Sequence, residues 1–151
     1  MTRAGFAALV GRPNVGKSTL LNRLTGEKLA IVSPKPQTTR RRILGVVHRP
    51  EGQLALVDTP GIHQAKGALN RRMVEVALQA LAEVDVVCLL IEVVDRPGPE
   101  EVGPADQLVL DRLRVLHKPV VLVINKIDAV PKKRLLPLID LYRARYPFAE
   151  I

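Results

Sequence analysis

Short apolar runs alternate with amphipathic stretches along this chain of 151 residues. The short aliphatic runs predict buried strands at residues 6–10, 43–47, 53–57, 85–93 and 119–124, with another strand opening at 147–151. Apolar positions at helical spacing predict helices at residues 18–24, 68–83, 105–116 and 132–143. Pro50, Glu51 and Gly52 form a turn signal between two of the strands, which predicts an antiparallel hairpin.

Strands that alternate with helices predict an α/β fold with a mostly parallel sheet, one antiparallel hairpin strand and helices on both faces. The chain is about one domain long, and it ends as a predicted strand begins. We therefore expect residues 1–151 to form one domain that is incomplete at its C-terminus.

Charge and composition narrow the class of protein. Hydrophobic residues make up 47% of the chain and aromatic residues 3%, so the core must be aliphatic. The formal net charge of +8 favours a polyanionic partner, either nucleic acid or an anionic membrane surface, and a merely basic surface is the alternative. No apolar run approaches the ~20 residues of a membrane span, and no signal-peptide pattern opens the chain. Cys88 lies in an apolar run, which predicts a buried thiol. A single cysteine fits a reducing compartment, so we expect a cytoplasmic location. The basic charge adds peripheral contact at the inner membrane face as a further expectation.

A phosphate-binding motif, Gly-x-x-x-x-Gly-Lys-Ser, spans residues 11–18, which we call the phosphate loop. It follows a predicted strand and opens a predicted helix, as such a loop must. Gly11 and Gly16 let the backbone approach phosphates, Lys17 can reach the β- and γ-phosphates, and Ser18 can bind Mg²⁺. The predicted nucleotide-binding residues here are Gly11, Arg12, Pro13, Asn14, Val15, Gly16, Lys17, Ser18 and Thr19. The motif alone predicts a nucleoside triphosphate without choosing the base.

The choice of base is predicted from a second loop, the guanine loop, which consists of Asn125, Lys126, Ile127 and Asp128. It follows a predicted strand, and open α/β sheets bind ligands at the carboxyl ends of their strands. The Asp128 carboxylate can accept hydrogen bonds from N1–H and the exocyclic amine of guanine, whereas adenine leaves it unpaired. Such a site rejects the analogue by ~10⁴-fold or more. Asn125 can tie this loop to the phosphate loop, and the Lys126 stem can lie over the base.

Two further segments are predicted to respond to the γ-phosphate. One follows a predicted strand and consists of Asp58, Thr59, Pro60, Gly61 and Ile62. There, Asp58 can hold Mg²⁺ through a water molecule, and the Gly61 amide can contact the γ-phosphate. Upstream, the hydroxyl of Thr38 or Thr39 can complete the Mg²⁺ shell when GTP is bound, which would order that segment.

These motifs and their order resemble the translation-factor-related branch of the P-loop GTPases, which have a Ras-like G domain. Within it, the stretch Pro-Gln-Thr-Thr-Arg-Arg-Arg-Ile at residues 36–43 is similar to the Era family of bacterial ribosome-assembly GTPases. The stretch at residues 11–22 is shared with that family, with the Der GTPases and with tRNA-modification GTPases. The Der GTPases and the tRNA-modification GTPases usually carry Asp at the position of Arg41 in this chain. The resemblance covers essentially the whole chain.

The resemblance implies a GTP-hydrolysing switch in small ribosomal subunit assembly. Its implied partners are GTP, GDP and the small subunit with its rRNA, without a stable protein partner. It favours Thr39 over Thr38 as the Mg²⁺ ligand. It also implies a fifth guanine-recognition loop and a KH RNA-binding domain beyond residue 151.

Catalysis is expected to depend on positioning and charge neutralisation by Lys17, Mg²⁺, Thr39 and the Gly61 amide. Ras-like enzymes orient the attacking water with a Gln, but this chain has Ile62 at that position, which predicts slow hydrolysis. In related GTPases an Asn at the position of Asn14 helps to bind K⁺ in place of an arginine finger, so the resemblance implies a K⁺ ligand here. The alternative is an Asn that only stabilises the loop. His63 as a base is less favoured, because a His on a loop is usually solvated.

Other interpretations stay open. The function can be that of a Der-like or tRNA-modification GTPase, or that of a largely non-catalytic guanine-nucleotide sensor. The basic run at residues 40–42 can contact rRNA or be a solvated surface. The basic run at residues 132–134 is predicted to be the exposed start of a helix.

Overall fold

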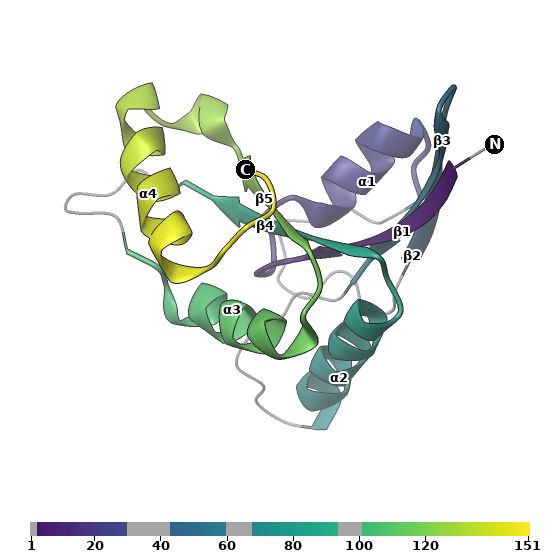
Figure 1. Cartoon of the computed structure of the whole chain (residues 1–151), viewed down its shortest axis with the longest axis horizontal. Helices are drawn as coiled ribbons and strands as arrows, with labels where there is room; N and C mark the ends of the chain where they lie inside the picture. The colour runs from purple at the N-terminus through teal and green to yellow at the C-terminus, as the bar shows by residue number, and fades with distance from the viewer. Residues whose placement is uncertain (1–2, 30–42, 60–67, 94–100) are drawn as a thin grey trace.

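The computed structural model describes residues 3–29, 43–59, 68–93 and 101–151, and the fold is given for these residues. Within them, five strands form one sheet in the order β2-β3-β1-β4-β5 (Figure 1). The strands are β1 (Arg3–Val10), β2 (Ile43–Arg49), β3 (Gly52–Asp58), β4 (Val86–Glu92) and β5 (Val120–Asn125). β2 and β3 pair antiparallel, and all other neighbours pair in parallel. The predicted mixed sheet with one hairpin is confirmed.

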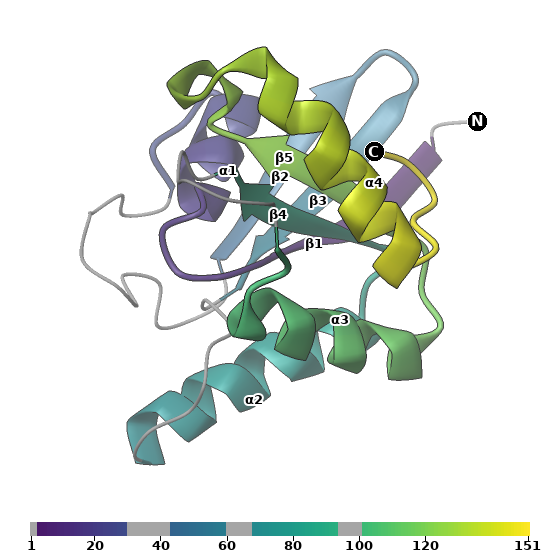
Figure 2. The same ribbon diagram turned by 90° about the vertical axis from the view of Figure 1, so that its left-hand side faces the viewer.

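Helices pack on both faces of this sheet, as predicted. They are α1 (Lys17–Thr25), α2 (Ala68–Ala82), α3 (Pro104–Leu116) and α4 (Leu135–Arg145). Among the described elements, α1 packs on one face, and α2, α3 and α4 pack on the other (Figure 1, Figure 2). No helix in the described ranges is both long enough and apolar enough to cross a membrane.

The predicted helix at residues 132–143 begins later than expected. Its first residues form a short 3₁₀ turn, η2 (Lys132–Arg134), and another 3₁₀ turn, η1 (Ile127–Ala129), precedes it. Pro137 lies in the first turn of α4, where the missing N–H of proline costs little. Lys132 and Lys133 are exposed, as predicted for this basic run, but Arg134 is half-buried and the run forms a 3₁₀ turn in place of the predicted helix start.

β4 shows why the sequence pattern predicted buried strands. Val87, Leu89 and Ile91 pack on the side of α2, α3 and α4, and Leu90 packs on the side of α1. A strand covered on both faces has a continuous apolar run. Cys88 lies in this run but is half-buried, which corrects the expectation of a buried thiol. Its partial burial still raises the pKa of the thiol.

The last residues of the chain return to the edge of the sheet at β5. The Ala149 N–H donates to the Val120 carbonyl at 2.8 Å, and the Leu122 N–H donates to the Glu150 carbonyl at 2.9 Å. These bonds form a parallel bridge between Val121 and Glu150. The bridge agrees with the predicted strand opening at residues 147–151.

The topology gathers the predicted loops at one edge of the sheet. β1, β3, β4 and β5 are mutually parallel, so their carboxyl ends, at Val10, Asp58, Glu92 and Asn125, lie along the same edge. The register pairs Leu9 with Asp58, and Glu92 with Asn125. The phosphate loop, the guanine loop and residues 58–62, which we call the Asp58 segment and of which Asp58 and Thr59 are described, all start from this edge.

Candidate functional site

The phosphate loop leaves β1 and enters α1 through two glycines that no other residue can replace without strain. Gly11 has a φ of 149°, and a Cβ there would lie 2.3 Å from the Leu90 carbonyl oxygen. Gly16 has a φ of 105°, and a Cβ there would lie 2.2 Å from Nδ2 of Asn125. Asn14 also has a positive φ, 64°, which Asn tolerates better than most residues. The predicted requirement for glycine therefore has a second cause, the close approach of β4 and the guanine loop.

Lys17 lies buried within the phosphate loop, with 6% of its surface exposed. Its ammonium donates hydrogen bonds to the Gly11 carbonyl at 3.2 Å and to the Arg12 carbonyl at 2.9 Å. Burial lowers the pKa of Lys17 from 10.5 to about 8, and the nearby Asp58 carboxylate opposes that shift. A phosphate that entered the loop would favour the charged ammonium, because its negative charge offsets the cost of burial.

The N-terminus of α1 adds to the anion site. The first amides of a helix have no partner within the helix, and the helix dipole places positive charge there. The first turn of α1 contains no acidic residue, and among the described residues no side chain caps it at Gly16. The loop and the helix end together can bind phosphate.

Ser18 and Asp58 come together beside Lys17. The Ser18 hydroxyl donates to Oδ2 of Asp58 at 2.6 Å, and Asp58 is fully buried. Both are oxygen donors, which fits Mg²⁺, since this ion is usually bound by one or two carboxylates together with substrate phosphates and water. The described residues contain no group of three or more His, Cys, Asp or Glu side chains suited to a metal. The other ligands of a bound Mg²⁺ would come from nucleotide phosphates, water and the predicted Thr39 hydroxyl, which lies outside the described residues.

The guanine loop is joined directly to the phosphate loop. The Asn125 side-chain amide donates to the Val15 carbonyl at 2.9 Å, which confirms the predicted tie between the two loops. The Lys126 ammonium donates to the Asn14 carbonyl at 2.6 Å and pairs with Glu92 at 2.6 Å. The prediction that the Lys126 stem covers a base stays a prediction.

Asp128 lies in the 3₁₀ turn η1 and is exposed. Its neighbour Ile127 is also exposed, by 50%. An exposed carboxylate next to the tied loops is placed where a base can approach it from solvent.

The other predicted residues divide into two groups. In the first group, Val15 is fully buried in the core, and the Thr59 hydroxyl donates to the Leu9 carbonyl at 2.7 Å, so both side chains serve the fold. Arg12 and Pro13 are half-buried and Thr19 is exposed. The second group lies outside the described residues and consists of Thr38, Thr39, the basic run 40–42, Pro60, Gly61, Ile62 and His63.

Two side chains that contact the loops, Glu92 and Asp106, and a third that holds Asp106, Tyr142, were missed by the sequence analysis. Glu92 ends β4 and pairs with Lys126, whereas Asp106 on α3 and Tyr142 on α4 reach the phosphate loop through Arg12. Arg12 and Asp106 are 94 residues apart in the chain. Asp106 resembles an ordinary first-turn acid of an amphipathic helix, so the pattern carried no signal for this contact.

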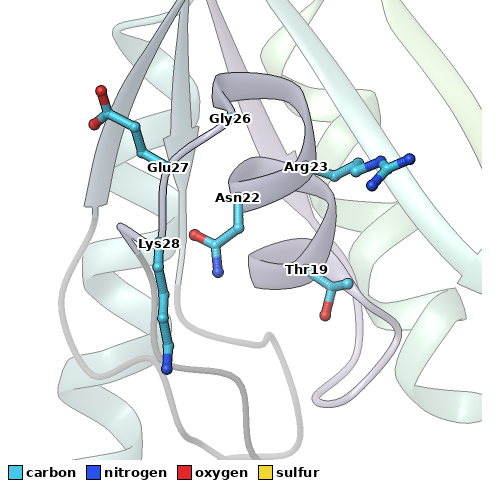
Figure 3. A pocket seen from close by; sticks show the side chains of 6 residues that line it. All are labelled: Thr19, Asn22, Arg23, Gly26, Glu27 and Lys28. Carbon is cyan, nitrogen blue, oxygen red and sulfur yellow. The ribbon is translucent and has the colours of Figure 1, made fainter.

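A hollow of about 440 Å³ lies on the outer side of α1 (Figure 3). It is lined by Thr19, Asn22, Arg23, Gly26, Glu27 and Lys28. The Asn22 side chain accepts a hydrogen bond from the Leu29 N–H at 2.9 Å, which holds the chain after α1 against the helix. The hollow adjoins the nucleotide motif through Thr19.

Known proteins match this chain in sequence and in fold. The family model described as 50S ribosome-binding GTPase matches residues 6–126. GTPase Era of Geobacter metallireducens is 53% identical over 149 residues, which are 99% of this chain and 48% of that protein. The chain therefore spans about half the length of the curated relatives it matches.

Solved structures show the same similarity. A crystal structure of Era in complex with MgGDPNP and nucleotides 1506–1542 of 16S ribosomal RNA matches with a TM-score of 0.91 and 44% identity, over 100% of this chain and 50% of that one. An Aquifex aeolicus Era variant bound to GDP·AlF4⁻ matches with a TM-score of 0.86 and 44% identity, over 99% of this chain and 50% of that one.

Proposed function

We infer the function from the family of this chain: it belongs to the 50S ribosome-binding GTPases, and within them it is similar to GTPase Era. We propose that it binds GTP and GDP, hydrolyses GTP slowly, and acts as a switch in small ribosomal subunit assembly. The observation that carries the proposal is the hydrogen bond from Asn125 to the Val15 carbonyl. It makes one site out of a loop that binds phosphates and a loop that can select guanine.

The residues of the site divide the work of binding. Lys17 and the first amides of α1 hold the phosphates, and Asp128 accepts the hydrogen bonds of guanine. Ser18, Thr39 and Asp58 would hold Mg²⁺, with Asp58 acting through a water molecule. Bound Mg²⁺ supplies neutralisation of charge on the β- and γ-phosphates.

Slow hydrolysis follows from the residue after Gly61. Ile62 has no polar group to orient a water molecule, and Gly61 supplies only its backbone amide to the γ-phosphate. We therefore expect turnover far below that of a Ras-type enzyme with its activator, which reaches ~5–20 s⁻¹. Single-turnover phosphate release by the purified chain, with Mg²⁺ or with EDTA, tests this. Slow, Mg²⁺-dependent release supports the proposal, and no release from bound GTP favours the non-catalytic sensor.

Asn14 is the proposed K⁺ ligand. It lies exposed at the tip of the phosphate loop, with a positive φ and with its carbonyl held by Lys126. A cation beside the β- and γ-phosphates would supply the positive charge that an arginine finger supplies in other GTPases. Turnover should be faster in K⁺ than in Na⁺ buffer, and the difference should vanish in Asn14→Ala. Equal rates in the two buffers would reject K⁺ stimulation, and the proposal that the chain binds GTP would still stand.

The ribosomal role is proposed from the similarity to Era, whose solved structure holds a 16S rRNA segment. We propose that a KH domain beyond residue 151 supplies the main RNA contact in the whole protein. Nucleotide-dependent co-sedimentation of the whole protein with small subunits is expected. Co-sedimentation with anionic vesicles instead would favour the membrane contact that the net charge of +8 also allows. Binding to tRNA alone would favour a tRNA-modification GTPase.

A further inference from the structure

Asp106 is a buried acid that none of the nucleotide motifs contains. Among the described residues, the buried polar or charged ones are Lys17, Asp58, Thr59 and Asp106. The first three belong to the phosphate loop and the Asp58 segment. Asp106, in the first turn of α3, is only 3% exposed. A carboxylate is rarely buried without partners, so its partners indicate its role.

Both carboxylate oxygens of Asp106 are engaged, each by a different part of the fold. Oδ1 accepts a hydrogen bond from Nε of Arg12 at 3.0 Å. Oδ2 accepts one from the Tyr142 hydroxyl on α4 at 2.8 Å. The Arg12 guanidinium also lies 3.9 Å from Glu92, at the end of β4. The side chain of Arg12 is thus held between α3 and the sheet edge.

The main chain of Arg12 binds the side chain of Lys17. The Arg12 carbonyl accepts the Lys17 ammonium at 2.9 Å. Further along the loop, Lys126 holds the Asn14 carbonyl and Asn125 holds the Val15 carbonyl. Arg12 differs from Asn14 and Val15 because its own side chain, and not a side chain of the guanine loop, anchors the phosphate loop there.

We propose that Arg12 is a positioning residue, anchored by Asp106 and Tyr142, that holds the phosphate loop in its nucleotide-binding shape before nucleotide arrives. The inference rests on the proposed nucleotide binding. A loop that is already shaped loses less conformational freedom on binding, so the anchor increases affinity. The anchor formed by Asp106 and Tyr142 acts through Arg12 on Lys17 and contacts no reacting atom. Loss of the anchor should therefore change the rate of hydrolysis at saturating GTP much less than it changes the affinity for nucleotide.

The test compares four variants by calorimetric titration with GDP, together with thermal unfolding. Arg12→Met should weaken GDP binding by about tenfold or more, the size expected for a lost charge-assisted hydrogen bond. It also leaves Asp106 buried without its cation, which should lower stability. Arg12→Met combined with Asp106→Asn removes that unpaired charge, so stability should recover while affinity stays low. Arg12→Lys, which keeps the charge without the Nε donor, should restore affinity only in part.

The matched control is Asp111→Asn on the same helix. Asp111 also pairs with an arginine, Arg114, at 3.2 Å, but both side chains are about half exposed and lie outside the loop contacts. This variant should bind GDP as the unchanged chain does. Equal GDP affinity for the folded Arg12→Met, Asp106→Asn double variant and the unchanged chain would overturn the positioning role. If the unchanged chain bound no GDP, the proposed function itself would fail, which is a distinguishable result.

Discussion

The phosphate loop and the guanine loop are joined by the hydrogen bond from Asn125 to the Val15 carbonyl but are built differently. The phosphate loop is buried and held from several sides: Val15 is in the core, Lys17 is 6% exposed, and Gly16 touches Asn125 so closely that a Cβ cannot fit. The guanine loop is held at its first two residues, whereas Ile127 and Asp128 are exposed.

This difference separates affinity from specificity. A loop of backbone amides with a buried ammonium can bind any nucleotide phosphate, because it recognises charge and shape. The exposed carboxylate of Asp128 contributes little to the stability of the fold, so its identity can be set by the base that it binds. Changes in the first loop should therefore affect all nucleotides alike, and changes in the second should affect the choice between them.

The largest effect is expected at Asp128. Asp128→Asn replaces an acceptor by an amide whose N–H groups face the donors of guanine. The preference for GTP over ATP should fall by up to about 10⁴-fold, while ATP binding changes little. Competition titrations with both nucleotides measure the ratio, and thermal unfolding without nucleotide is the control. A preference that survived the substitution would assign the choice of base to another residue.

The second effect concerns Gly16. Gly16→Ala places a Cβ where Nδ2 of Asn125 now lies, at a φ that Ala rarely adopts. We expect GTP and ATP binding to weaken alike, by up to about a hundredfold, which is near the upper end of what overpacking costs of ~1–3 kcal/mol imply. Gly26→Ala is the matched control, since Gly26 also has a positive φ, 76°, at the other end of α1, but a Cβ there would meet none of the described residues beyond its chain neighbours within 4 Å. It should lower stability and leave binding intact.

The third effect is a pH dependence from Lys17. Its pKa is about 8 in the free chain, and phosphate would raise it, so binding above pH 8 must take up a proton. Affinity should fall as pH rises through 8, by up to about tenfold per pH unit. The free chain should gain stability as pH rises from 8 towards 10.5, because only its unfolded form keeps the proton there. Calorimetry in two buffers of different ionisation enthalpy measures the uptake, and its absence above pH 8 would contradict this role of Lys17.

The smallest effect is expected at Lys126. Its ammonium contacts Glu92 and the Asn14 carbonyl, but its side chain is 42% exposed, and such exposed pairs contribute little. Lys126→Met should weaken GDP binding by no more than about fivefold. Lys133→Met, on the exposed turn η2, is the matched control. A loss of a hundredfold would mean that Lys126 anchors the loop as strongly as Gly16 does.

The sequence predicted what depends on local pattern. Apolar runs revealed the strands because β4 and its neighbours are covered on both faces, and glycine spacing revealed the phosphate loop. The tie from Asn125 was predicted because both loops had to meet at one sheet edge. What the pattern could not show were contacts between distant residues. Asp106 looks like any first-turn acid until α3 and α4 bring it to Arg12.

Smaller errors have similar causes. The helix predicted from residue 132 starts at Leu135, because charge and propensity do not distinguish a 3₁₀ turn from the first turn of a helix. Cys88 is half-buried, because its apolar neighbours in sequence do not determine how fully α1 covers that side of β4.

The central claim, that one site binds phosphates through the first loop and selects guanine through the second, is tested most directly by competition. The chain is loaded with fluorescent GDP, which is then displaced by GTP or ATP at a pH below 8. We predict that ATP needs a concentration about 10⁴-fold higher than GTP for half displacement. Displacement by both nucleotides at the same concentration would contradict the account.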